Sequence, residues 1–175
     1  LLGPIWFLFG PLFTVFTYTF AFNKIANIPT DGIPAPVFYL AGTILWNYFQ
    51  ACFNGASNTF KANSNIFGKV YFPRLIPSIS LVFSNLLKLG LQFIVFLCFV
   101  FYYSNKGLIS PNSAIVYFPI LIIIIATMAL GIGLIISSLT VKYRDINQLI
   151  GALLMLLMYA SPIVYPSSSV PDRIK

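Results

Sequence analysis

Five long hydrophobic stretches alternate along the chain with short segments that are polar or rich in proline. A membrane-spanning helix needs about 20 mainly apolar residues, because each residue adds about 1.5 Å along the helix axis. None of the stretches alternates polar and apolar residues, which argues against the strands of a membrane barrel. The pattern therefore predicts an all-α integral membrane protein with a bundle of five transmembrane helices. The predicted spans are residues 5–22, 36–60, 76–103, 114–139 and 149–165.

Composition narrows the class further. Of 175 residues, 59% are hydrophobic and 7% are charged, whereas a soluble domain has roughly 25% charged residues. The net charge of +7 does not indicate a nucleic-acid partner, because the basic residues are scattered singly and form no stripe. Two isolated cysteines make neither a disulfide framework nor a metal site. A soluble enzyme, a disordered chain and a disulfide scaffold are excluded.

The distribution of lysine and arginine between the loops predicts the orientation in the membrane. Residues 61–74 and 140–148 together hold five basic side chains, whereas residues 23–35 and 104–113 hold one each. Since cytoplasmic loops are enriched in basic residues, loops 61–74 and 140–148 are predicted to be cytoplasmic. We expect residues 1–175 to form a single transmembrane domain. Because the chain starts almost inside the first span and stops just after the fifth, we expect it to be part of a longer protein.

Polar side chains form two stripes inside the predicted membrane spans. Amide groups in lipid are costly, and a lysine at mid-helix costs roughly 2.5–3.5 kcal/mol. Each stripe shares one face of its helix, so both should face protein or a wet cavity. Hydrogen bonding between helices and a polar pathway or subunit seam remain alternatives. The stripes contain Asn47, Gln50, Asn54, Ser57 and Asn58 in the second span, and Ser84, Asn85, Lys88 and Gln92 in the third.

Small residues recur at four-residue steps in the fourth span, at Ala129, Gly133 and Ser137. Small side chains at this spacing allow another helix to approach closely. We therefore predict that this face packs against a neighbouring helix, in preference to a role in gating.

The chain lacks residues for chemistry of its own. It has no histidine and three aspartates, all in loops, so no pair of buried groups can act as general acid and base. The segment around Gly68 and Lys69 fails as a phosphate-binding loop, because Asn63 and Val70 replace the required glycine and hydroxyl residue. We predict no catalytic residue, metal or cofactor in this chain. Energy for uphill transport would then come from a partner.

The predicted cytoplasmic loop 61–74 mixes apolar and basic side chains in the order KANSNIFGKVYFPR. This mixture predicts a short amphipathic helix at the membrane interface, ended by Pro73. The helix would either dock a partner protein or serve as an interfacial anchor through Tyr71 and Lys69. The sequence of this loop is compatible with both roles.

Four short segments, in order along the chain, resemble the permease subunit of ABC-2 type polysaccharide exporters, which include O-antigen, capsule and teichoic acid export systems. They are WNYF at 46–49, KVYFPR at 69–74, YRDI at 143–146 and SPIVYP at 161–166. The opening LGPIW at 2–6 is also similar to the start of that family's first span. The resemblance covers essentially the whole chain.

The resemblance implies a six-span subunit of the bacterial plasma (inner) membrane, of which this chain supplies five spans. It also implies a homodimer that binds two ATPase subunits, with ATP and Mg held by those partners. The cargo would be a lipid-linked polysaccharide, and the aromatic side chains Tyr48, Phe49 and Phe53 beside the first stripe are candidates for stacking on sugar rings. By the same resemblance the ATPase-coupling loop comprises Lys61, Phe67, Lys69, Tyr71, Phe72, Pro73 and Arg74, and Tyr143, Arg144 and Asp145 lie in a second loop on the same side.

Three alternatives remain at this point. A lipid or glycan flippase driven by an ion gradient would need buried ionisable groups, and Lys88 is the only one within a span. An ABC-2 exporter of a non-glycan cargo would share the same motifs. A purely structural membrane scaffold is disfavoured by the two polar stripes.

Overall fold

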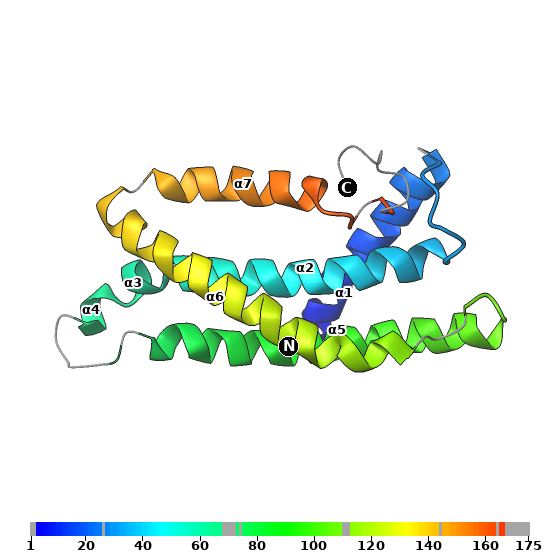
Figure 1. Ribbon diagram of the computed structural model, residues 1–175, viewed down its shortest axis with the longest axis horizontal. Helices are drawn as coiled ribbons and strands as arrows, with labels where there is room; N and C mark the ends of the chain where they lie inside the picture. The colour runs from blue at the N-terminus through cyan, green and yellow to red at the C-terminus, as the bar shows by residue number, and fades with distance from the viewer. Residues whose placement is uncertain are drawn as a thin grey trace. The chain divides into compact units, whose positions relative to one another are not determined.

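Helices form the regular structure in the computed structural model, which describes residues 3–25, 27–67, 73, 75–109, 113–143, 145–163 and 165–166 (Figure 1). Side chains at 3–8, 65–66, 113–114 and 147 are not described. No strand occurs in these ranges, which confirms the predicted all-α class. In chain order the elements are α1 (Gly3–Tyr18), the π-helix η1 (Thr19–Ile25), α2 (Ala35–Ser57), α3 (Thr59–Ala62), α4 (Ser64–Phe67), α5 (Ile76–Asn105), the 3₁₀-helix η2 (Ser113–Tyr117), α6 (Phe118–Lys142) and α7 (Ile146–Ala160).

Each predicted span coincides with a helix, and two helical stretches among the described residues are long and apolar enough to cross a membrane. These are Ile76–Asn105 and Ile115–Lys142. Helix α2 has 23 residues, which is about 35 Å and also sufficient in length, but its polar stripe makes it less hydrophobic. Helix α7 has only 15 residues. Membrane crossing by α1, α2 and α7 stays a prediction.

Helix α7 ends at Ala160, not at residue 165 as predicted. Pro162 has no N–H to donate and its ring clashes with the preceding turn, which favours a helix end at this position. The amide of Ser161 still donates to the carbonyl of Leu157 at 2.9 Å, and the chain then turns at residues 161–163. The apolar run of the sequence therefore continues beyond the end of the helix, and the predicted end of this span was too late.

Helix α2 also ends early, at Ser57 rather than at residue 60. The carbonyl of Asn54 accepts three hydrogen bonds: from the amide of Asn58 at 3.3 Å, from its side-chain Nδ2 at 3.0 Å, and from Ser57 Oγ at 3.1 Å. Side-chain donors that compete for a helical carbonyl weaken the regular backbone ladder. The chain makes a turn at Asn58 and resumes as α3.

The remaining helices extend past their predicted ends. The first span continues as η1 to Ile25, and Thr19 Oγ1 at the change of helix type donates to the Val15 carbonyl at 2.8 Å. Helix α5 continues to Asn105, and α6 continues to Lys142. The predicted loop 140–148 is therefore reduced to the three residues between α6 and α7.

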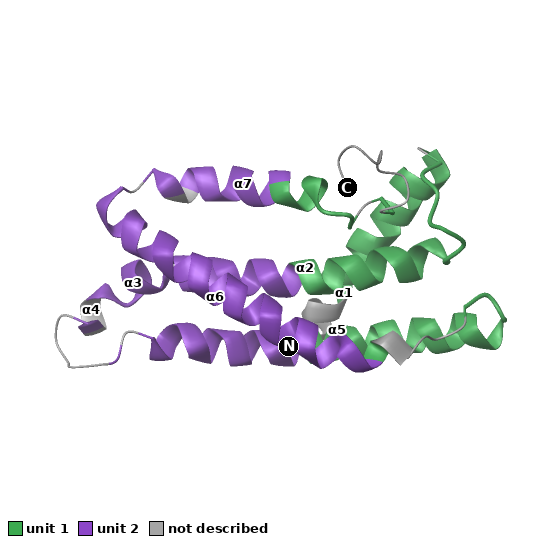
Figure 2. Ribbon diagram, viewed as in Figure 1, with its two compact units in different colours: residues 1–46, 88–115, 157–175 green, residues 47–87, 116–156 purple. Residues whose placement is uncertain are grey.

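The chain divides into two compact units, which alternate along the sequence (Figure 2). In unit 1, Tyr39 is fully buried, and its ring lies 6.1 Å from that of Tyr18 and 6.4 Å from that of Phe22. Gly42 of α2 packs closely on Ile163. Unit 1 thus has an aromatic core where α1, η1 and the start of α2 meet. Unit 1 comprises residues 1–46, 88–115 and 157–175, and unit 2 comprises residues 47–87 and 116–156.

Unit 2 has a core of small side chains between the second half of α2 and α6. Cys52, Ala56 and Ala129 are almost completely buried. Gly55 of α2 contacts Leu81 of α5. Because small residues let helix backbones approach closely, this core holds α2 and α6 close together.

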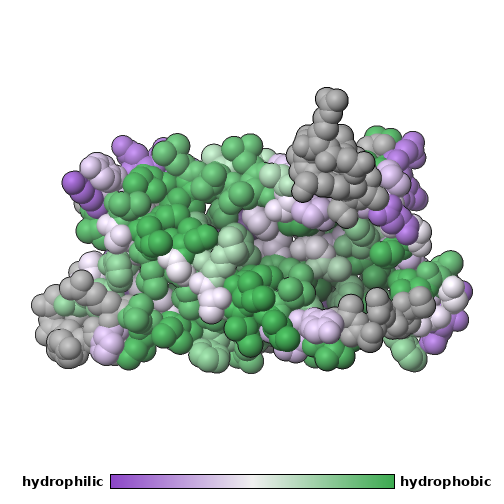
Figure 3. All heavy atoms as spheres, in the orientation of Figure 1, coloured by the Kyte–Doolittle hydropathy of each residue, from purple (hydrophilic) through white to green (hydrophobic). Residues whose placement is uncertain are grey.

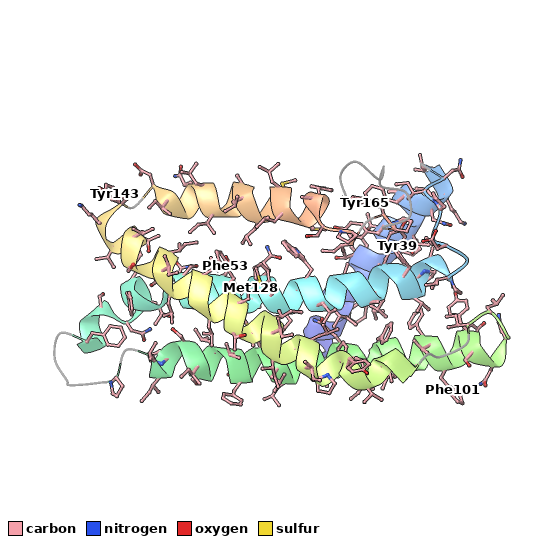
Figure 4. The ribbon with its side chains drawn as sticks, in the orientation of Figure 1. Tyr39, Phe53, Phe101, Met128, Tyr143 and Tyr165 are labelled. Atoms are coloured by element: carbon pink, nitrogen blue, oxygen red, sulfur yellow. The ribbon has the colours of Figure 1, made fainter. Side chains whose placement is uncertain are left out.

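Large apolar side chains are exposed along α5, α6 and α7, and hydrophobic residues cover most of the visible face (Figure 3). Leu87 is 76% exposed and Phe101 is 70% exposed, the latter pointing away from its helix (Figure 4). Soluble monomers rarely expose apolar patches of this extent. The exposed faces are suited to contact with lipid.

Candidate coupling site at the α2–α3 junction

The first part of the predicted coupling loop folds as two one-turn helices, α3 and α4. Lys61 is exposed, whereas Phe67 is half-buried and its ring lies edge-on to Phe60 at 6.2 Å. Pro73 is exposed, and its carbonyl accepts a hydrogen bond from the amide of Ile76 at the start of α5. The predicted coupling residues Lys69, Tyr71, Phe72 and Arg74 lie outside the described part of the chain.

Side chains of the loop itself stabilise α3. Asn63 Nδ2 donates to the carbonyl of Thr59 at 2.9 Å, and Ser64 Oγ donates to the carbonyl of Lys61 at 3.0 Å. The last carbonyls of a helix have no partner within the helix, and these two bonds satisfy part of that need. The segment directly after α2 is therefore held in a defined conformation.

The second predicted loop lies at the same end of unit 2 as α3 and α4 (Figures 1 and 2). Tyr143 is exposed at the end of α6 (Figure 4), and Lys142 Nζ lies 5.3 Å from the centre of its ring. Asp145 is exposed, and its carbonyl accepts a hydrogen bond from the amide of Gln148. Arg144 lies outside the described residues. Within this unit, the two loops predicted to be cytoplasmic share one end.

Helix α6 provides a cap for α3 across the unit. Asn58 precedes α3 but its side chain makes no capping bond. The amide of Phe60 donates instead to Ser137 Oγ at 3.1 Å. In an uninterrupted helix this amide would donate to the carbonyl of Ala56. Insertion of a side chain into a helical ladder is a known cause of a break, so Ser137 contributes to the interruption between α2 and α3.

A second hydroxyl link joins α3 to α5. Ser78 Oγ donates to Thr59 Oγ1 at 2.9 Å, and Thr59 Oγ1 donates to the carbonyl of Gly55 at 2.8 Å. We call Thr59, Ser78 and Ser137 together the hydroxyl junction. All three are buried, and a buried polar group that loses its partner costs about 1–3 kcal/mol. Thr59 and Ser78 were not predicted from the sequence, although each is a hydroxyl residue at the end of a span.

The small-residue face of α6 lies against α2 and α3. Ala129, Gly133 and Ser137 are all buried. Gly133 contacts Ala56 and the backbone of Phe53 in α2. Thr140, which the sequence analysis did not single out, extends the buried face by one turn and donates to the Ser137 carbonyl at 3.0 Å. This face therefore combines close packing with the cap on α3.

The amide residues of the polar stripe of α2 lie beside the packed face, whereas Ser57 lies within it. Asn47, Gln50 and Asn54 are half-buried, and Asn58 is exposed. Ser57, the fifth member, is buried. The row of amides is thus open on one side, as a pathway or a subunit seam would require.

Two of the three aromatic candidates for sugar stacking belong to the core. Tyr48 is 4% exposed and Phe53 is 3% exposed. Their burial does not support a role in stacking on sugar rings, because both side chains lie on the packed face of α2. Phe49 is half-buried and stacks on Phe53 at 5.8 Å between ring centres.

The polar stripe of α5 is only partly sheltered. Asn85 is buried and its Nδ2 donates to Cys52 Sγ at 3.9 Å, and Lys88 is half-buried. Ser84 is exposed in the single chain, so its contact with protein or a wet cavity stays a prediction. Successive helix residues are about 100° apart, which puts Ser84 at the rim of the stripe. Gln92, within unit 1, lines a small hollow with Pro11, Leu12, Leu40 and Val95.

A basic side chain marks the far end of α5. Lys106 Nζ lies 4.5 Å from the ring centre of Tyr102. Hydrogen bonding with Tyr102 raises the pKa of Lys106 above its usual value. The lysine therefore stays charged at neutral pH and favours a position outside the hydrocarbon.

The chain belongs to the ABC-2 type transporter family, which matches residues 1–174. It is accordingly a membrane protein of a transporter family, as the four motif segments predicted. It is 27% identical over 174 residues to the O-antigen export system permease protein RfbA of Myxococcus xanthus, covering 98% of this chain and 64% of that protein. A protein of the same name from Klebsiella pneumoniae is 27% identical over 177 residues, covering 99% of this chain and 65% of the relative. The chain thus spans slightly less than two thirds of the length of these curated relatives.

Proposed function

We propose that this chain is the transmembrane permease part of an ATP-driven ABC exporter that moves a lipid-linked polysaccharide, similar to O-antigen, across the bacterial plasma (inner) membrane. The observation that carries the proposal is its likeness, over 98–99% of its length, to permeases of O-antigen export systems. The protein crosses the membrane several times in this proposal, through the helices that coincide with the five predicted spans. Loops 61–74 and 140–148 face the cytoplasm.

Energy for export comes from a separate ATPase subunit, which binds ATP and Mg. Residues 61–74 provide its main docking surface and the turn between α6 and α7 provides a second. The shared position of these loops at one end of unit 2 supports this assignment. The permease chain itself hydrolyses nothing, since its carboxylates are few and isolated in sequence.

The half-exposed amide row of α2 faces the cargo path or a second copy of the permease. Amide groups both donate and accept hydrogen bonds, so they can pair with sugar hydroxyls or with the same row on another subunit. Asn47, Gln50 and Asn54 are the side chains of that row which are open on one side. A homodimer would place two such rows along one path.

The docking role is tested with the full-length permease and its ATPase subunit in cells that export the glycan. The double variant Phe72→Ala/Arg74→Ala is expected to reduce co-purification of the ATPase and glycan export by about tenfold or more, since a hot-spot pair at an interface contributes at least about 1.4 kcal/mol. The matched control is Tyr102→Ala/Lys106→Ala, which removes an aromatic and a basic side chain at the other end of α5. The control is expected to leave ATPase binding unchanged.

Normal ATPase binding and normal export in the Phe72/Arg74 variant would reject the docking role. Glycan transport by the purified permease alone, driven by an imposed ion gradient, would reject the ATP-driven mechanism. Such a result would favour the flippase alternative.

A further inference from the structure

We propose that the hydroxyl junction is the positioning element that makes α3, α5 and α6 move together when the loop after α2 is displaced. The inference rests on the proposed function, because it assumes that a partner acts on residues 61–74. Thr59, Ser78 and Ser137 are its positioning residues, and none of them touches the partner or the cargo.

Helix α3 is hydrogen-bonded to two other helices through its first two residues. Thr59 accepts a hydrogen bond from Ser78 of α5 at 2.9 Å. The amide of Phe60 donates to Ser137 of α6 at 3.1 Å. Two neighbouring residues of one short helix thus connect segments that lie 19 and 77 positions away in sequence.

Burial makes these hydrogen-bonded links stiff. Thr59, Ser78 and Ser137 are buried, and the bond from Ser78 to Thr59 is itself buried, so it is stronger than it would be in solvent. Thr59 also donates to the carbonyl of Gly55 in the last turn of α2, and Thr140 donates to the carbonyl of Ser137. The junction is therefore linked to the backbone on both sides.

A displacement of the loop would reach α5 and α6 through α3. Lys61 and Ser64 are exposed on the loop side of the junction, where a partner has access. Helix α6 contacts α3 directly, and Gly133 lies close against Ala56 and the backbone of the last turns of α2. Packed helices with hydrogen-bonded contacts shift as units rather than deform continuously. A push on α3 is thus passed to α6 at Ser137 and to α5 at Ser78.

The experiment uses the full-length permease with its ATPase subunit in proteoliposomes and measures three quantities. They are ATPase binding, the rate of ATP hydrolysis, and glycan moved per ATP hydrolysed. Thr59→Val keeps the shape of the side chain but removes the hydroxyl, whereas Thr59→Ser keeps the hydroxyl. Ser137→Ala removes the cap on Phe60, and Ser138→Ala is its matched control, since Ser138 is exposed and donates only to Ile135.

We expect Thr59→Val and Ser137→Ala to lower glycan moved per ATP by about tenfold, a typical size for a coupling between distant sites. ATPase binding is expected to stay near the wild-type value. Thr59→Ser and Ser138→Ala are expected to retain normal export. An unchanged ratio in the first two variants, or loss of ATPase binding in them, would overturn the inference, because the junction would then be dispensable or only a support for the docking surface.

A second measurement does not depend on how well those variants fold. Spin labels on cysteines at positions 64 and 138, both exposed in unit 2, report the distance between the loop and α6. In a Cys98→Ser background, which removes the exposed native cysteine, this distance should stay constant through the ATP cycle. A change of that distance during the cycle would overturn the inference. Failure of the ATPase to bind the unaltered permease would instead reject the proposed function.

Discussion

Gly133 of α6 lies so close to Ala56 of α2 that a Cβ atom at position 133 would come within 2.6 Å of the Ala56 Cβ. Carbon atoms pack favourably at about 3.5–4.0 Å, so the two helices would have to separate. We expect Gly133→Ala to lower the free energy of unfolding by about 1–3 kcal/mol, the usual cost of overpacking. Thermal unfolding of the full-length permease in detergent measures the effect.

Gly131 provides the matched control for that substitution. A Cβ at position 131 would meet no atom within 4 Å, and alanine is favoured over glycine in a helix by about 1 kcal/mol. Gly131→Ala should therefore leave the unfolding temperature unchanged or raise it. Equal behaviour of the two variants would contradict the close approach of α6 and α2.

The hydroxyl of Tyr39 supplies a prediction for unit 1. It is buried and has no hydrogen-bond partner among the described residues, so it carries a desolvation cost without compensation. We expect Tyr39→Phe to raise the free energy of unfolding by about 1 kcal/mol. Tyr18→Phe, which removes only a weak bond to Met158 Sδ at 3.8 Å, should change it by less than about 0.5 kcal/mol. A lower unfolding temperature for Tyr39→Phe would reveal a partner for that hydroxyl.

Neighbouring positions in α5 are expected to respond differently to the loss of a polar group. Asn85 is buried with a bond to Cys52, whereas Ser84 is exposed. Asn85→Ala should lower the free energy of unfolding by about 0.6–1.7 kcal/mol, the range for hydrogen bonds between helices in membranes. Ser84→Ala should have no measurable effect in the same unfolding assay. A larger effect at Ser84 would show that the rim of the stripe is covered in the assembled protein.

Chemical labelling in intact cells checks the predicted orientation. In a Cys98→Ser background, a cysteine replacing Ser64 should resist a membrane-impermeant thiol reagent added from outside, because loop 61–74 is predicted to be cytoplasmic. A cysteine replacing Lys106 should react, since it is exposed at the other end of α5. Both should react after the membrane is permeabilised. The reverse pattern would invert the topology.

The helical class and the positions of the helices could be predicted from the sequence because long apolar runs leave few alternatives in a membrane. The small-residue face of α6 was also visible, since Gly133 and Ser137 lie one helical turn apart. Helix ends were harder to predict. Hydropathy does not register the effect of Pro162 on α7, or of the side chains of Ser57 and Asn58 on α2.

The hydroxyl junction could not be predicted from the sequence, and the physical reason is a different one. Serine and threonine usually bond within their own helix, as Thr43 and Thr127 do here. The bond from Phe60 to Ser137 joins residues 77 positions apart, and one chain gives no sign of that pairing. The burial of Tyr48 and Phe53 was not predicted, because neighbouring positions on α2 face different surroundings.

The cap on α3 also restricts how the length of α6 can vary. Gly133 meets α2 and Ser137 meets α3 only because the step of four residues from one to the other corresponds to about one helical turn. One inserted or deleted residue between these positions would rotate the serine by about 100° away from Phe60. Related chains can exchange side chains along this stretch of α6, but they are expected to keep its residue count unchanged.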